Sequence, residues 1–171
     1  MSLPARPLIL QILAVAFMLA LSVVLQSQLA HRIAVYNARP DFLLVTLACA
    51  ASLMGFPRSV WLGLIVGLLA AATAPGAYGA TLASRTLTGA VAGRSRTLLV
   101  RNSVFSAPLI ALSSTIACEL IYNLIARNGH LRQLAVPLTG ELLYNIVFAV
   151  PIYTIFRWCG VGSREQSPFA H

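Results

Sequence analysis

The sequence predicts an all-α integral membrane protein with about six transmembrane helices, in one domain that spans residues 1–171. Hydrophobic residues make up 58% of the chain and charged residues only 9%, whereas a soluble domain carries about 25% charged residues. The mean hydropathy is +0.83. A spanning helix needs about 20 apolar residues, so six helices and short turns occupy nearly the whole chain. The polar stretches are too short for an aqueous catalytic domain, and we therefore expect a protein that is not an enzyme.

The first two helices follow from an uncharged run and from a helix-start signal. Residues 7–30 contain no charge, and this run is longer than the 7–15 apolar residues of a signal peptide. The second helix is expected over 41–55 and is short. Pro40 and Asp41 suit its start, because proline lacks an N–H that a first turn does not use and aspartate faces the positive end of the helix dipole.

Four more helices are expected over 57–73, 77–93, 104–126 and 135–158. An uncharged turn joins the helices over 57–73 and 77–93, which predicts a tight hairpin. An arginine-rich turn follows the helix over 77–93, and Pro151 predicts a kink inside the helix over 135–158. Residues 159–171 form a short polar tail.

Arginine counts in the turns predict the orientation, because cytoplasmic loops carry more basic residues. With both termini in the cytoplasm, the inner side holds seven arginines: Arg6, Arg58, Arg94, Arg96, Arg101, Arg157 and Arg164. The outer side holds four: Arg32, Arg39, Arg127 and Arg132. We therefore expect a multi-pass protein with cytoplasmic termini.

Two GxxxG motifs lie in the third and fourth helices, at Gly63 with Gly67 and at Gly89 with Gly93. Small residues allow helix backbones to approach closely in lipid, where burial from water no longer drives association. The motifs predict either packing between these two helices or a surface for a partner's span.

Three ionisable residues interrupt the apolar runs: Arg85, Glu119 and Glu141. Each costs a few kcal/mol in contact with lipid, so each is expected to face the bundle interior. The helical rise places all three about 9–12 Å below the outer surface. Asn123 and Asn145 follow the two glutamates at i+4, on the same helix faces. One interpretation is that Arg85 neutralises one glutamate, the other glutamate is protonated, and the network fixes helix packing. The alternative is a partner-binding surface or a pocket for a small ligand or lipid headgroup.

Motifs for cofactors, metals and hydrolytic chemistry are absent from the sequence, which contains no GxxxxGK[ST], HExxH or GxSxG. The cysteines and histidines have no metal-ligand spacing: Cys49, Cys118, Cys159, His31, His130 and His171. The net charge of +8 comes from arginines between apolar runs, which is typical of contact with lipid headgroups rather than nucleic acid.

The order of several motifs resembles the rod shape-determining protein MreD family over nearly the whole chain. The matching segments are Val24–Ser27, Arg39-Pro40-Asp41 with the leucines that follow, Gly63–Gly67, Gly89–Gly93 with its arginines, and Glu141–Asn145 with Pro151. Many family members carry an aspartate where this chain has Ala71, so a role that depends on that acid is not expected here.

The resemblance implies a non-enzymatic scaffold in the bacterial inner membrane. Such proteins bind the bitopic protein MreC, connect to MreB filaments and to the elongation glycosyltransferase and transpeptidase, and help to position lateral peptidoglycan synthesis. The family is also similar in fold to the S components of energy-coupling-factor transporters. That similarity implies the alternative function, a subunit that binds a small molecule or lipid for transport.

Overall fold

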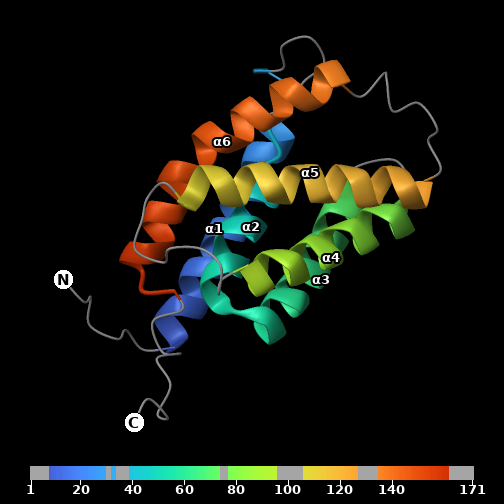
Figure 1. Ribbon diagram of the computed structural model, residues 1–171. Coiled ribbons are helices and arrows are strands. Elements are labelled where there is room, and N and C mark those ends of the chain that lie inside the picture. Colours follow the sequence, from blue (N-terminus) through green and yellow to red (C-terminus); the bar gives the residue numbers. More distant parts are fainter. Residues whose placement is uncertain are drawn as a thin grey trace.

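In a computed structural model, the described residues are 8–29, 32–33, 39–73, 77–95, 106–126 and 135–161. They form six α-helices and no strand (Figure 1). The helices are α1 (Leu8–Gln28), α2 (Phe42–Met54), α3 (Phe56–Thr73), α4 (Tyr78–Ser95), α5 (Ser106–Ala126) and α6 (Ala135–Trp158). Their limits differ from the expected ranges by at most two residues.

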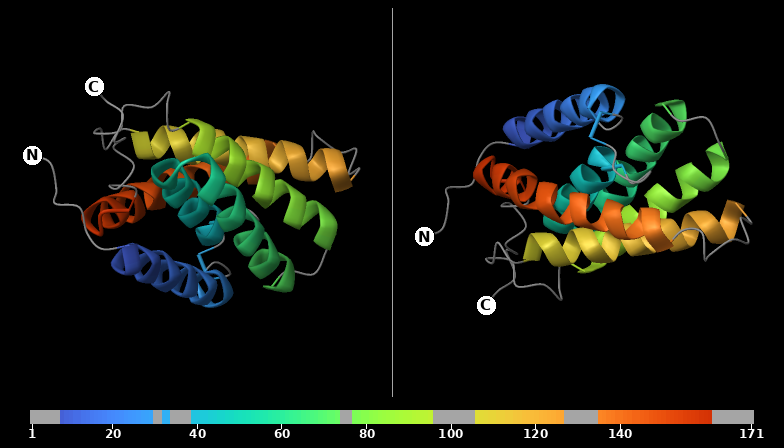
Figure 2. Two further views of the ribbon diagram at one scale, coloured as in Figure 1. Left: turned by 90° about the horizontal axis from the view of Figure 1, so that it is seen from below. Right: turned by 90° about the horizontal axis from the view of Figure 1, so that it is seen from above.

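The short helix α2 is the centre of the bundle. It contacts all five other helices, and Figure 2 shows it between α1 on one side and the remaining helices on the other. Every residue from Phe42 to Leu53 is buried. With 13 residues, α2 is about 20 Å long, less than the roughly 30 Å of a bilayer's hydrocarbon core. The helix is therefore a buried core element that is too short to cross the hydrocarbon core by itself.

Within the described ranges, four helices are long and apolar enough to cross a membrane: α1, α3, α5 and α6. The helix α2 is too short by this criterion, and α4 carries Arg85, Arg94 and several hydroxyl side chains. Large apolar side chains are exposed on the outer faces, including Ile9, Phe17, Trp61 and Leu124. An apolar exterior around a packed interior matches a lipid environment, and the chain has the character of a multi-pass membrane protein.

The hairpin of α3 and α4 packs with very close backbone contact. A Cβ atom on Gly63 would lie 2.8 Å from the carbonyl oxygen of Arg85, and one on Gly89 would lie 2.5 Å from that of Ser59. Both GxxxG motifs thus lie between the two helices. An added Cβ atom on Gly67 would meet Leu82, and one on Gly93 would meet Ser59 and Phe56. This face is covered within the chain.

A glycine also makes the turn between α2 and α3. Gly55 has a φ of 84°, in the left-handed region that residues with a Cβ rarely adopt. Its N–H donates to the carbonyl of Ala51 at 3.3 Å. The chain can therefore reverse direction between the two helices within one residue.

Candidate functional site

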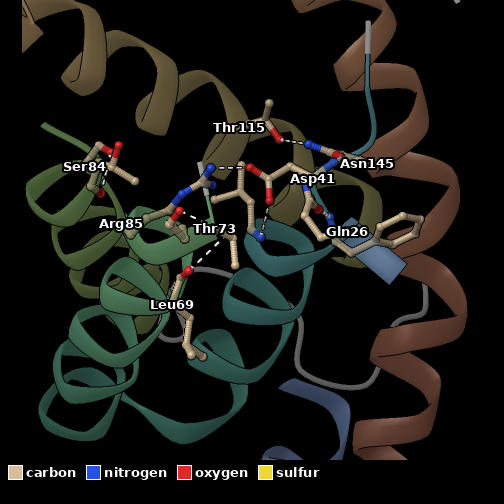
Figure 3. Close-up of polar contacts among 12 residues, drawn as sticks. Gln26, Asp41, Leu69, Thr73, Ser84, Arg85, Thr115 and Asn145 are labelled. Atoms are coloured by element: carbon tan, nitrogen blue, oxygen red, sulfur yellow. Dashed lines mark hydrogen bonds and ion pairs between the residues drawn. The ribbon is translucent and has the colours of Figure 1, made fainter. Parts of the chain in front are cut away.

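The N-terminus of α2 lies inside the bundle, where its free N–H groups need partners from other helices. Asp41 caps the helix itself, because its Oδ1 accepts from the Leu44 N–H at 2.9 Å. The Phe42 N–H donates to Gln26 Oε1 on α1 at 2.9 Å. The Asp41 N–H donates to Asn145 Oδ1 on α6 at 3.0 Å. Side chains from two other helices thus fix the start of α2 (Figure 3).

Arg85 of α4 forms an ion pair with the same aspartate. Its Nη2 donates to Asp41 Oδ2, and Figure 3 shows the guanidinium reaching across from α4 to the end of α2. The side chains are 11% and 14% exposed, respectively. The carboxylate therefore meets a helix N-terminus and a guanidinium, and both stabilise its negative charge.

This pairing corrects the expectation that Arg85 neutralises a glutamate. The sequence interpretation treated Asp41 only as a helix-start residue and did not include it among the buried charges. Because α2 is too short to span the hydrocarbon core, its first turn lies at the depth of the other charges. Asp41 consequently takes the position of counter-ion for Arg85.

Glu119 and Glu141 nevertheless belong to the same electrostatic neighbourhood. Both are partly buried, and both interact through their charges with Arg85 and Asp41. Two guanidinium nitrogens of Arg85, Nε and Nη1, are buried without a hydrogen-bond partner in the part of the chain that the structure describes. The cluster therefore combines one arginine, three acids and two unused donors.

Residues 119–123 and 141–145 share the sequence Glu-x-x-Tyr-Asn, but the two segments have different roles in the packing. Asn145 is fully buried, and besides accepting from Asp41 it donates through Nδ2 to Thr115 Oγ1 on α5 at 3.0 Å. Asn123 donates instead to the Glu119 carbonyl of its own helix at 2.8 Å. Only Asn145 connects three helices, so the sequence similarity of the segments is not a similarity of function.

Sequence reasoning missed Gln26 and Thr115 as members of this cluster. Gln26 lies in a segment that carries the family resemblance, but its partner on α2 is 16 positions away and no periodicity indicates it. Thr115 is one of several hydroxyl residues on α5, and its sequence context does not distinguish it. Tyr144 makes a similar contact between distant parts of the chain, because its hydroxyl donates to the Ile33 carbonyl at 2.7 Å.

The remaining predicted residues lie outside this cluster. Arg39 is exposed and Pro40 is buried, while Cys49 and Cys118 are buried and Cys159 is partly buried, all three as free thiols. Several residues named from the sequence fall outside the described ranges: Arg6, His31, Arg96, Arg101, Arg127, His130, Arg132, Arg164 and His171.

Comparison with protein families, with curated proteins and with solved structures finds no significant match to this chain.

Proposed function

We propose that this chain is a non-enzymatic membrane scaffold of the bacterial cell-elongation complex. In this proposal it binds an MreC-like bitopic protein in the inner membrane and helps to position lateral peptidoglycan synthesis. MreB filaments and the elongation glycosyltransferase and transpeptidase are further partners in the same proposal.

One observation carries the proposal. Gln26, Asp41 and Asn145 come from three segments that resemble the MreD family, and their side chains meet at one helix end. Polar side chains that bind backbone N–H groups and each other hold helices in fixed positions. A rigid bundle of this kind suits a protein that places other spans rather than one that transforms a substrate.

The proposal also constrains the surface on which a partner's span would lie. The small-residue face of α3 and α4 is covered within the chain, whereas α1 exposes Ile9, Leu13 and Phe17 by 60% or more. Between apolar helices in lipid, close packing provides the attraction. The outer face of α1 is therefore our preferred surface for a bitopic partner.

A depletion experiment tests the scaffold role. Rod-shaped cells that lose this protein should become round, and an affinity-tagged copy should retain a bitopic partner from native membranes. Unchanged rods after full depletion contradict the proposal. In the same cells, Arg39→Gln is the matched control for a variant in which Asp41 is replaced with asparagine. Arg39 is exposed and lies two residues from Asp41, so its loss should leave cell shape and partner binding unchanged.

A second candidate, a transport subunit that binds a small molecule or lipid, is favoured by the unused Nε and Nη1 donors of Arg85. Buried donors without acceptors are costly, and an anionic group of a ligand would satisfy them. Under this candidate, the purified chain gains thermal stability with one member of a panel of vitamin-like carboxylates and phosphates. Absence of any stabilisation across the panel contradicts it.

A further inference from the structure

A groove opens between α1 and α3 at the end of the molecule opposite the Asp41 cluster. Its volume is about 330 Å³, within the roughly 300–1,000 Å³ range of small-molecule sites. The residues that line it are Gln11, Ile12, Val15, Met54, Arg58, Trp61, Leu62, Ile65 and Val161.

The shortness of α2 explains why the groove exists. Gln26 of α1 accepts from Phe42, and Ser22 bonds to Thr46 at 2.6 Å, so α1 and α2 run antiparallel in a fixed register. Continuing that register brings the last residue of α2, Met54, level with Ala14. The first turns of α1 therefore extend past α2 and face α3 across an open space.

The α3 wall of the groove changes from polar to apolar along its length. The exposed Arg58 precedes Trp61 and Ile65 at spacings of one and two helical turns, whereas Gln11 on the α1 wall is buried. Tryptophan at a helix end is typical of the headgroup level of a membrane. The groove thus has a polar mouth at the membrane surface and an apolar interior.

Charge is distributed unevenly along the bundle. Arg58 lines the groove, and Arg94 and Arg157 lie near the ends of α4 and α6 at the same end of the bundle. The three acids that the structure describes are instead near the opposite end: Asp41, Glu119 and Glu141. An occupant of the mouth is therefore favoured if its polar end is negative.

We propose that this groove binds one anionic phospholipid, with its headgroup beside Arg58 and an acyl chain along Ile12, Val15, Leu62 and Ile65. The amphipathic lining selects a molecule with a charged end and an apolar chain. Lipid in this position fills the space that α2 leaves between α1 and α3, and so connects two helices that have few contacts of their own.

Native mass spectrometry of the full chain in detergent tests this proposal, with phosphatidylglycerol and phosphatidylcholine of the same acyl chains as probes. Wild-type protein should retain one phosphatidylglycerol in preference to phosphatidylcholine. Arg58→Gln should weaken that binding about five-fold, the effect of one basic residue at an anionic surface. Arg94→Gln is the matched control, because Arg94 is an exposed arginine that does not line the groove.

A second pair of variants tests the position of the acyl chain. Ile12 is 56% exposed and lines the groove, whereas Leu10, two residues away, is 46% exposed and does not. Ile12→Trp should fill the groove and abolish phosphatidylglycerol retention, and Leu10→Trp should leave it unchanged.

Three outcomes overturn the proposal. The first is equal retention of the two lipids, and the second is full displacement of phosphatidylglycerol by inorganic phosphate, which indicates a site for free anions. The third is unchanged lipid retention in Ile12→Trp together with loss of a co-purifying protein, which indicates that the groove seats a partner's span.

Discussion

The carboxylate of Asp41 binds the guanidinium of Arg85, a residue 44 positions later in the chain, and at the same time caps the helix that begins beside it. One side chain thus joins α2 to α4 and satisfies a free backbone N–H. The position of the central helix depends on this double contact.

Replacing Asp41 with asparagine should destabilise the protein by about 3–5 kcal/mol, because it leaves Arg85 buried and unpaired. Asparagine still accepts a hydrogen bond at a helix N-cap, so the loss of stability measures the contribution of the negative charge of Asp41. Thermal unfolding in detergent measures the change. The matched Arg39→Gln variant should remain within about 0.5 kcal/mol of wild type, and an equal loss in both variants contradicts the role of the ion pair.

Close packing of α3 against α4 makes a different prediction. Gly89→Ala should destabilise the bundle by about 1–3 kcal/mol, because the new methyl group would lie 2.5 Å from the Ser59 carbonyl oxygen. Gly79→Ala, in the first turn of the same helix, is the control, since nothing lies within 4 Å of its added Cβ. Denaturant titration in micelles compares the two variants. Equal stability of both would show that the helices do not approach as closely as described.

The repeated Glu-x-x-Tyr-Asn segment provides an internal comparison. Asn145→Leu should cost about 1–3 kcal/mol, because it leaves the Asp41 N–H and Thr115 without a partner in the interior. Asn123→Leu should cost less, because the hydrogen bonds of Asn123 are made to Glu119 of its own helix and join no second helix. Both variants can be ranked by unfolding temperature. A larger loss for Asn123 than for Asn145 would contradict the network.

The helices themselves could be predicted from the sequence because lipid imposes a simple requirement. Apolar runs must be long enough to cross the hydrocarbon core and must end where arginine, proline or glycine allows a turn. These signals are local. Even the shortness of the second helix was visible in its expected range of 41–55.

The partner of Arg85 could not be derived in the same way, since ion pairing depends on where helices cross. The estimate from helical rise grouped Arg85 with Glu119 and Glu141, whose charges do interact with it, but it did not include Asp41, which was assigned only to the start of the second helix. A stricter use of length would have included it, because a helix of about 15 residues spans only about 22 Å. The contacts of Gln26 and Thr115 depend on interhelical packing, for which the sequence contains no periodic signal.

The most direct test of the structural role of the Asp41–Arg85 pair is the shape of cells that depend on the Asp41→Asn/Arg85→Gln double variant. This variant removes both charges and retains an N-cap, so a network that serves only to hold helices should largely recover its stability relative to Asp41→Asn alone. We predict that such cells remain rods, with an aspect ratio close to that of wild type. Round cells that contain the double variant in the membrane at the wild-type level would show that Asp41 or Arg85 has a role beyond their mutual contact, and would contradict the account.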